Sequence, residues 1–296
     1  MRIAFVETVT ELLDERDDIA LVLADISVSL FERSGAVSSH PQRVFNVGIR
    51  EQLMVSVAGG MAVEGMRPIA HSYTPFLIER AYEQIKLDLG HQGVAAILVS
   101  IGASYDASSV GRTHAAPEDV SLINALPEWT VHLPGHANEV RTLLRDAAAD
   151  TGNVYIRLSE TQNKDAIKNP ASLTTIREAS PDTPLVIAVG PMLDRVVGAT
   201  SGIDVRVVYT TTLGQQSSED LALLATGGDV IVVEPASVGT SIAHIAGRLN
   251  DRPRRFLGIG VPLGEHRMYG TIADHDIQHQ LDTGGIRRQI EHWLAG

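Results

Sequence analysis

The 296-residue sequence contains no cysteine. This absence excludes disulfide bonds, thiolate nucleophiles and cysteine-based zinc sites, and it is compatible with a reducing compartment without demonstrating one. Aromatic residues make up only 4% of the chain, but hydrophobic residues make up 44%, which supplies enough apolar surface for folded cores. No run of 18 apolar residues occurs, and Glu7 and Glu11 interrupt the first segment before a signal-peptide core can form. We therefore expect a soluble, cytoplasmic protein that does not associate with membranes.

Basic residues are also scarce. Lysine and arginine number 24 against 36 aspartates and glutamates, which gives a formal net charge of −12. A surface this acidic repels phosphodiester backbones instead of releasing their counterions. Nucleic acid is therefore not an expected partner.

Apolar strands and amphipathic helices alternate along the whole chain. Near-continuous apolar strands separated by such helices are typical of parallel sheets covered on both faces. The sequence therefore predicts an α/β protein with two doubly wound domains: residues 1–160, a polar and proline-punctuated linker over 161–183, and a smaller domain over 184–296. The predicted helices include segments 76–89, 218–226 and 286–295, and the predicted strands include 19–25, 67–73, 94–102 and 229–235.

The segment RVFNVGIREQLMVSVAGGMAVEG, residues 43–65, places Glu51 in the first turn of a helix that follows a strand and a glycine. Such strand-to-helix junctions at the carboxyl ends of parallel strands form ligand crevices, where a carboxylate is well placed for proton chemistry. The simpler interpretation is that Glu51 only complements the helix dipole. Taken alone, the segment leaves both interpretations open.

Five ordered blocks carry a resemblance to a known family. They are RVFNVGIREQ (43–52), AGGMAVEGMRP (58–68), FLIERAYEQI (76–85), GRTHAAPEDV (111–120) and HLPGHANEV (132–140). With them, nearly the whole chain resembles the C-terminal subunit of split, thiamine-diphosphate-dependent transketolases. The resemblance implies a thiamine pyrimidine-binding domain followed by a transketolase C-terminal-like α/β domain.

The resemblance implies roles for five residues around the cofactor. Glu51 matches the carboxylate that hydrogen-bonds the pyrimidine N1′, Phe76 and the nearby Tyr73 match the aromatic contacts of the aminopyrimidine, and Asp25-Ile26 resembles the Asp-Leu pair at the thiazolium. The alternatives are a core aromatic for Phe76 and a turn-capping side chain for Asp25.

The resemblance also implies substrate contacts. His114, in the Gly-x-Thr-His block, matches the histidine that contacts donor and acceptor oxygens, and an imidazole suits that task because it can donate to or accept from a developing alkoxide. Arg2 and Ser29 match two phosphate-contacting positions, although an exposed terminal residue and a turn former would explain them equally. Arg112 is a further substrate-binding candidate in the same loop.

The family's Gly-Asp-Gly element, which binds the diphosphate and its Mg²⁺ or Ca²⁺, does not occur in the sequence; Gly228-Asp229 is followed by Val230. The resemblance therefore implies a partner, an N-terminal transketolase subunit that carries the metal site, and a heterotetramer as the assembly. We expect no metal site on this chain itself.

Three departures from the family pattern concern the substrate. An arginine that contacts phosphate is replaced by Glu160, which turns an attraction to a dianion into a repulsion. The positions of a histidine and an aspartate that contact substrate hydroxyls hold Gly102 and Val110. Asp106, Tyr105 or Arg112 could compensate for them. We therefore expect an altered substrate: less phosphorylated, less hydroxylated, or carrying a positive group near Glu160.

Three further patterns are not expected to bind ligands. Pro134 and Gly135 separate His132 from His136 and break any helix that would align them on a zinc ion. Asp274-His275-Asp276 with His279 is interpreted as a solvated acidic face. The glycines at 258, 260 and 264 do not have the spacing of the dinucleotide fingerprint.

The leading hypothesis is a subunit that transfers a two-carbon ketol unit from a ketose-type donor to an aldehyde. A decarboxylating carboligase or a 2-oxo acid dehydrogenase β-type subunit is an alternative that release of CO₂ would reveal. A non-catalytic paralogue acting as a scaffold is another. The C-terminal domain, including Glu234, is expected to be structural.

Overall fold

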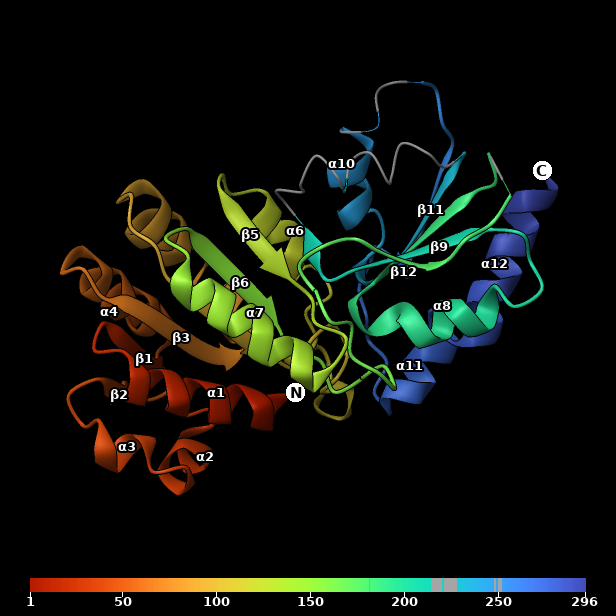
Figure 1. Cartoon of the computed structure of the whole chain (residues 1–296). Helices are drawn as coiled ribbons and strands as arrows, with labels where there is room; N and C mark the ends of the chain where they lie inside the picture. Colours follow the sequence, from red (N-terminus) through yellow and green to blue (C-terminus); the bar gives the residue numbers. More distant parts are fainter. Residues whose placement is uncertain (181, 214–219, 221–227, 248, 250–251) are drawn as a thin grey trace.

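The computed structural model describes residues 1–180, 182–213, 220, 228–247, 249 and 252–296. The chain forms two lobes, each built on one sheet (Figure 1). This confirms the predicted α/β fold with two domains in sequence. The helix predicted over 218–226 falls almost entirely outside the described residues. Within the part of the chain that the structure describes, no helix is long and apolar enough to cross a membrane.

The first sheet has the strand order β10-β5-β6-β4-β3-β1-β2, and only β10 runs antiparallel to its neighbour. Its strands are β1 (Ile19–Leu23), β2 (Val44–Asn46), β3 (Arg67–Tyr73), β4 (Ile97–Ile101), β5 (Trp129–His132), β6 (Asn153–Arg157) and β10 (Thr212–Leu213). The second sheet has the order β12-β11-β8-β9-β7, with β7 antiparallel. Its strands are β7 (Thr174–Arg177), β8 (Leu185–Val189), β9 (Arg206–Thr210), β11 (Val230–Ser237) and β12 (Phe256–Val261).

Helices cover these sheets. The α-helices are α1 (Arg2–Glu15), α2 (Val28–Arg33), α3 (Ala36–Ser39), α4 (Glu51–Val63), α5 (Tyr82–Gln84), α6 (Asp119–Asn124), α7 (Ala137–Ala149), α8 (Leu193–Ala199), α10 (Thr240–Ala246), α11 (Ile272–Gln278) and α12 (Thr283–Ala295). The π-helices are η1 (Pro75–Arg80) and η2 (Ile85–His91), and the 3₁₀ segments are η3 (Ser108–Val110), η4 (Arg112–His114) and η5 (Gly190–Met192). The predicted helix over 76–89 is therefore a π-helix, a short α-helix and a second π-helix in succession.

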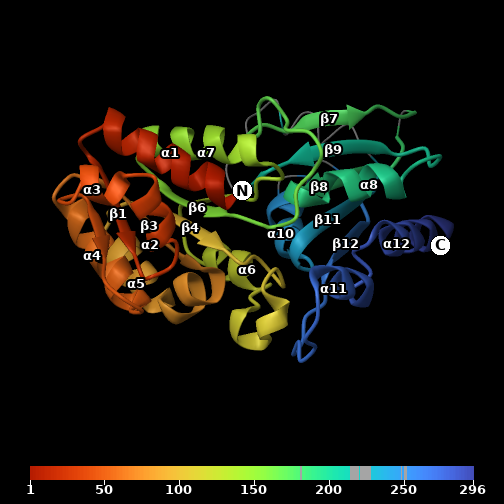
Figure 2. The ribbon, with the colours of Figure 1, turned by 90° about the horizontal axis from the view of Figure 1, so that it is seen from below.

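The first sheet is buried on both faces because its side chains alternate between two cores. Leu21 and Leu23 of β1 pack with α1 and α7, whereas Val22 packs with α4 and α6. Helices α1 and α7 lie side by side over one face (Figures 1 and 2). Every residue of β1 is buried, as the apolar sequence of this strand predicts.

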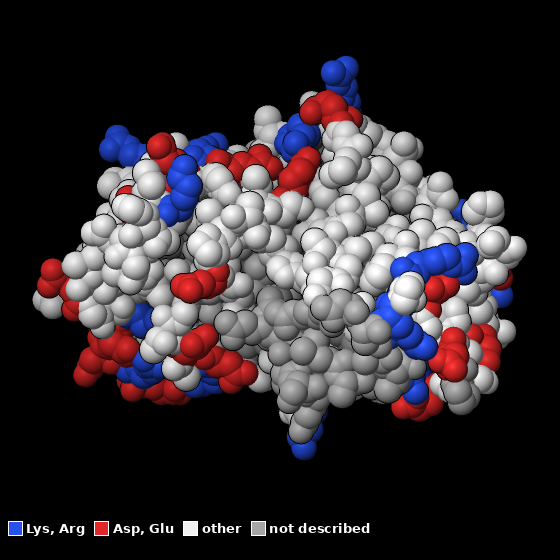
Figure 3. All heavy atoms as spheres, turned by 90° about the horizontal axis from the view of Figure 1, so that it is seen from above, with Lys and Arg blue, Asp and Glu red and all other residues white. Residues whose placement is uncertain are grey.

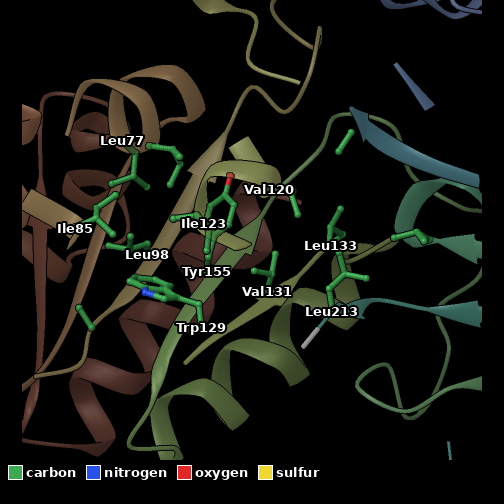
Figure 4. Close-up of a cluster of buried hydrophobic side chains, with 14 of the residues drawn as sticks. Leu77, Ile85, Leu98, Val120, Ile123, Trp129, Val131, Leu133, Tyr155 and Leu213 are labelled. Atoms are coloured by element: carbon green, nitrogen blue, oxygen red, sulfur yellow. The ribbon is translucent and has the colours of Figure 1, made fainter. Parts of the chain in front are cut away.

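The two lobes share a continuous core. Figure 4 shows Leu133 at the end of β5 beside Leu213 of β10, a strand that leaves the second lobe to pair with the first sheet. Strand β7 falls within the segment 161–183 assigned to a linker, pairs with β9 and is not among the predicted strands. Its polar sequence is compatible with an edge strand, which has one neighbour and is half-exposed.

Acidic and basic side chains are interspersed on the face shown in Figure 3, mainly toward the two ends of the molecule. Part of this charge is paired between helices: Arg145 of α7 bridges Glu11 and Glu15 of α1. Exposed pairs of this kind contribute less than about 1 kcal/mol each.

Candidate functional site

The candidate residues gather where parallel strands of the first sheet end. Strands β1, β3 and β4 are adjacent and parallel, so the loops that follow Leu23, Tyr73 and Ile101 emerge at the same edge. In open α/β sheets the crevice outside this edge is the usual ligand site. The sequence predicted this location.

Glu51 is the first residue of α4, as predicted, and its side chain is only 1% exposed. Ser72 Oγ donates to Glu51 Oε1 at 3.4 Å, and Arg80 Nη1 donates to Glu51 Oε2 at 2.7 Å. A buried carboxylate needs such partners because burial of an unpaired charge is costly. Sequence reasoning missed Arg80, although this residue lies within the FLIERAYEQI block.

Three aromatic side chains meet beside this carboxylate. The ring centroids of Phe76 and His114 are 5.0 Å apart, those of Tyr73 and His114 are 5.5 Å apart, and those of Tyr73 and Phe76 are 6.1 Å apart, all in edge-to-face arrangements. The guanidinium of Arg80 lies 4.2 Å from the Phe76 ring centroid. The fold thus brings Glu51 and His114, from two distant segments, to the neighbouring residues Tyr73 and Phe76.

Asp25 lies on the exposed loop after β1, in the left-handed region at φ +64°. Its carboxylate accepts a hydrogen bond from Asn46 Nδ2 at 3.0 Å, and Asn46 Oδ1 in turn accepts from the amides of Asp25 and Gly48. Asn46, which sequence reasoning did not single out, therefore links the Asp25 loop to the turn that precedes Glu51. Ile26 is half-buried and packs against the core formed with α1.

A cavity of about 260 Å³ opens beside Tyr73. It is lined by Met1, Arg2, Tyr73, Ile101, Gly102, Ala107, Leu158, Ser159 and Glu160. Gly102 has φ +75°, and a Cβ at this position would lie 2.6 Å from Tyr73 Cδ1. The Tyr73 ring therefore fills the space that a side chain at position 102 would need. Val110, the other departure, is exposed on η3.

Arg2 borders this cavity, but its Nε donates to Ser27 Oγ at 3.0 Å. Ser27 Oγ also lies 2.7 Å from Nε2 of the buried His71, whose Nδ1 lies 2.8 Å from the Val99 carbonyl oxygen. Since that carbonyl can only accept, Nδ1 carries the proton and Nε2 accepts from Ser27. The structure places Ser27 beside Arg2, whereas Ser29 is exposed on α2; the predicted Arg2 and Ser29 are not brought together.

Glu160 lines this cavity, and Asp106, which does not line it, is hydrogen-bonded to the same segment. Asp106 accepts hydrogen bonds from the Glu160 amide at 2.9 Å and from Ser159 Oγ at 3.3 Å. Burial raises the pKa of Asp106 to about 7; the charge of Glu160 adds to the rise, while the Glu160 amide and Arg157 oppose it. Glu160 itself is exposed.

Arg157 is buried in the core and is bonded there. It pairs with Asp119 at 2.7 Å, and both side chains are at most 1% exposed. Tyr155 Oη donates to the same Asp119 oxygen at 2.6 Å, and Arg157 Nη2 donates to Ser104 Oγ at 2.6 Å.

The guanidinium of Arg112 is already engaged in two ion pairs. It forms ion pairs with Glu118 at 3.2 Å and with Glu265 at 3.4 Å. Tyr105, proposed as a compensating residue, donates to Asp276 Oδ1 at 2.7 Å and thereby connects the two lobes. Neither side chain therefore replaces the missing substrate contacts in this structure.

The prediction of a solvated face over 274–276 is wrong for two of its residues. Asp276 is buried and pairs with Arg195 at 2.7 Å, and the buried His275 stacks on Tyr105. No local pattern indicates these partners, because both belong to elements distant in the sequence. Asp274 is exposed and forms a capping box with Thr271, the N-cap residue of α11.

His132, His136 and Glu234 make structural contacts. His132 lies 2.9 Å from Thr212 on the neighbouring strand, and His136 caps α7. Burial raises the pKa of Glu234 to about 7 against the opposing hydrogen bonds from the Ser241 hydroxyl and amide and from the Gly239 amide. Among the described residues, no group of three or more histidine, aspartate or glutamate side chains is arranged to hold a metal ion.

Residues 1–164 match the sequence model of the transketolase pyrimidine-binding domain. The chain belongs to the transketolase family. A pyrimidine-binding domain of this family implies the use of thiamine diphosphate.

Known relatives cover nearly the whole transketolase-family chain. It is 41% identical over 298 residues to an uncharacterized 33.6 kDa protein in the fasciation locus of Rhodococcoides fascians, covering 99% of this chain and 94% of that protein. It is 28% identical to the 6-deoxy-6-sulfo-D-fructose transketolase subunit SqwH of Clostridium sp. (strain MSTE9), covering 90% and 86%. Among solved structures, a split-gene transketolase described as an inactive β4 tetramer superposes with a TM-score of 0.79 at 25% identity, covering 98% and 96%. The chain is thus a homologue of split transketolase subunits, which implies a partner subunit.

Proposed function

We propose that this chain and an N-terminal subunit together form a thiamine-diphosphate-dependent transferase. The enzyme moves a two-carbon ketol unit from a ketose-type donor to an aldehyde acceptor. The single observation that supports this most strongly is Glu51: a carboxylate with 1% exposure at the start of α4, beside Phe76 and at the edge where β1, β3 and β4 end. A residue that only complemented a helix dipole would gain nothing from this burial, because dipole effects do not require desolvation.

When bound, thiamine diphosphate supplies a nucleophilic carbon that breaks and forms C–C bonds beside a carbonyl. Glu51 would hydrogen-bond the pyrimidine nitrogen, and Phe76 with Tyr73 would contact the ring. Asp25 and Ile26 would face the thiazolium, since their loop follows the adjacent strand β1. The residues fit this ring chemically, but a ring can reach Glu51 only after a covering side chain moves, because the carboxylate has almost no accessible surface.

His114 is the residue we assign to substrate oxygens. Its ring is half-buried and is held edge-to-face by Phe76 and Tyr73. An imidazole fixed in this way can hold or release a proton at an oxygen on which negative charge develops.

The diphosphate and its Mg²⁺ or Ca²⁺ would be held by the partner's Gly-Asp-Gly element. We propose a heterotetramer of two such pairs. The relationship to SqwH, whose name identifies it as a subunit, supports a two-chain enzyme.

The cavity beside Tyr73 supports a substrate without a terminal phosphate dianion. Glu160 lines its wall, Asp106 lies directly behind, and the Nε of Arg2 is already engaged with Ser27. A dianion there would be repelled by the exposed carboxylate of Glu160, which stands where the family pattern has an arginine. Arg112 remains a candidate for a substrate contact only if it leaves its two glutamate partners.

The test is co-expression with a neighbouring-gene polypeptide that carries Gly-Asp-Gly, followed by titration of thiamine diphosphate and magnesium. We expect a stable pair that binds the cofactor and transfers ketol units, and we expect Glu51→Gln to reduce turnover by at least 100-fold, since general acid–base effects contribute roughly 10²–10⁴. Glu64→Gln is the matched control, because Glu64 is exposed at the other end of α4.

Three outcomes would redirect the proposal. Release of CO₂ during turnover would favour the decarboxylating carboligase or the 2-oxo acid dehydrogenase β-type subunit. Unchanged turnover in Glu51→Gln would favour the scaffold. A chain that neither associates with such a partner nor binds the cofactor would refute the split-enzyme assignment.

A further inference from the structure

Arg80 covers the two groups on which the proposed function depends. It lies at the end of η1, four residues after Phe76, and is 39% exposed. Its guanidinium contacts the Phe76 ring at 4.2 Å from the centroid and donates to Glu51 Oε2 at 2.7 Å. A partly exposed cation therefore lies between the buried carboxylate and the solvent and stacks on the half-buried Phe76 ring.

These two contacts are also the ones that the proposed function, on which this inference rests, assigns to the aminopyrimidine. A guanidinium is planar, stacks on aromatic faces and presents N–H donors in its plane. An aminopyrimidine is likewise planar and also stacks and hydrogen-bonds to a carboxylate. The same face of the Phe76 ring and the same Glu51 oxygen cannot contact the guanidinium and the aminopyrimidine at the same time.

The accessibility of Glu51 makes displacement necessary. A hydrogen-bond partner must touch a carboxylate oxygen, and a side chain with 1% exposure offers no surface for that contact. Arg80 is the bonded neighbour with a path into the solvent. It also ends a π-helix, whose wider turn is less stable than an α-helical turn and is frequent at functional sites.

We propose that Arg80 is a gate residue: in the separate chain its guanidinium occupies the place of the aminopyrimidine, and it turns outward when the cofactor ring enters. The apparent affinity for the ring is then the intrinsic affinity multiplied by the fraction of molecules in which the Arg80 side chain has turned outward. Chains without the partner would thus hold the cofactor poorly.

The test uses 4-amino-5-hydroxymethyl-2-methylpyrimidine, the isolated ring, titrated calorimetrically into the full chain. We expect Arg80→Met to bind the ring at least tenfold more tightly than the wild type, and Arg80→Lys to bind with intermediate affinity because lysine retains charge without the planar fork. Arg141→Met is the matched control: Arg141 is 38% exposed and pairs with Glu7, away from this site. Its affinity should equal that of the wild type.

Weaker or unchanged binding in Arg80→Met would overturn the gate and would show that Arg80 supports Glu51 in the bound state. If Arg80→Met does not fold, the lysine variant decides by the same comparison. Failure of the proposed function looks different: the partner-bound wild type would then bind no thiamine diphosphate, whatever residue stands at position 80.

Discussion

The contact between Gly102 and Tyr73 gives a prediction whose magnitude follows from two separable terms. Gly102→Ala places a residue with a Cβ at φ +75°, which costs about 1 kcal/mol or somewhat more for left-handed backbone. The same Cβ would lie 2.6 Å from Cδ1 and 3.0 Å from Cε1 of the Tyr73 ring. Forcing the ring aside adds about 2 kcal/mol, as other overpacked sites do. We expect the free energy of unfolding to fall by about 3 kcal/mol in total.

Gly93→Ala is the matched control, because Gly93 has φ +71° and nothing within 4 Å of its Cβ position. It should lose only the backbone term of about 1 kcal/mol. Urea denaturation monitored by circular dichroism measures both variants, and repeating Gly102→Ala in a Tyr73→Ala background should reduce its cost to that of the control. Equal costs for Gly102→Ala and Gly93→Ala in the wild-type background would refute the claim that the ring occupies the space at position 102.

Three further predictions concern buried polar groups and helix packing. Burial lowers the pKa of His71 to about 3, so the unfolded chain binds a proton at this group near pH 6.5 and the folded chain does not; the group should cost about 2 kcal/mol of stability between pH 7 and pH 5, measured as the part of the wild-type pH dependence that His71→Asn removes. Asp119→Ala leaves Arg157 buried without its ion pair and should cost about 3–5 kcal/mol in denaturant titrations, so a loss under 1 kcal/mol would contradict a desolvated pair. Gly59→Ala would put a Cβ 2.6 Å from the Asp88 carbonyl oxygen and should lower the thermal midpoint of unfolding clearly, because backbone cannot yield as a flexible side chain can.

Sequence patterns predicted the architecture well because it depends on hydrophobic periodicity. The fully apolar strand β1 and the strand-to-helix junction at Glu51 are both local signals. Strand β7 was missed because an exposed edge strand lacks the apolar alternation of a buried one. The burial of Asp276 was missed because its partner, Arg195, is far away in the sequence.

The candidate site was predictable as a set of residue types but not as a set of contacts. Glu51, Phe76 and His114 followed from family blocks, whereas the ion pair of Arg80 depends on a π-helix that no periodicity of 3.6 indicates. Likewise, the sequence shows at Gly102 only that a polar side chain of the family pattern is absent. In the structure the Tyr73 ring fills the space beside Gly102, so the lost polar contact is replaced by an aromatic wall.

Backbone strain at the site edge connects these observations. Asp25 and Ser27 after β1 and Ser104 after β4 have positive φ without being glycine, a conformation that persists only when surrounding contacts determine it. Asn46 binds the backbone amide and the carboxylate of Asp25, and Arg157 donates to Ser104 from within the core. These side-chain hydrogen bonds therefore do more than satisfy their own atoms. They hold the loops after β1 and β4, the two strands that flank β3, in conformations that they would otherwise leave, so removal of an anchor such as Arg157 should loosen the site edge as well as destabilise the fold.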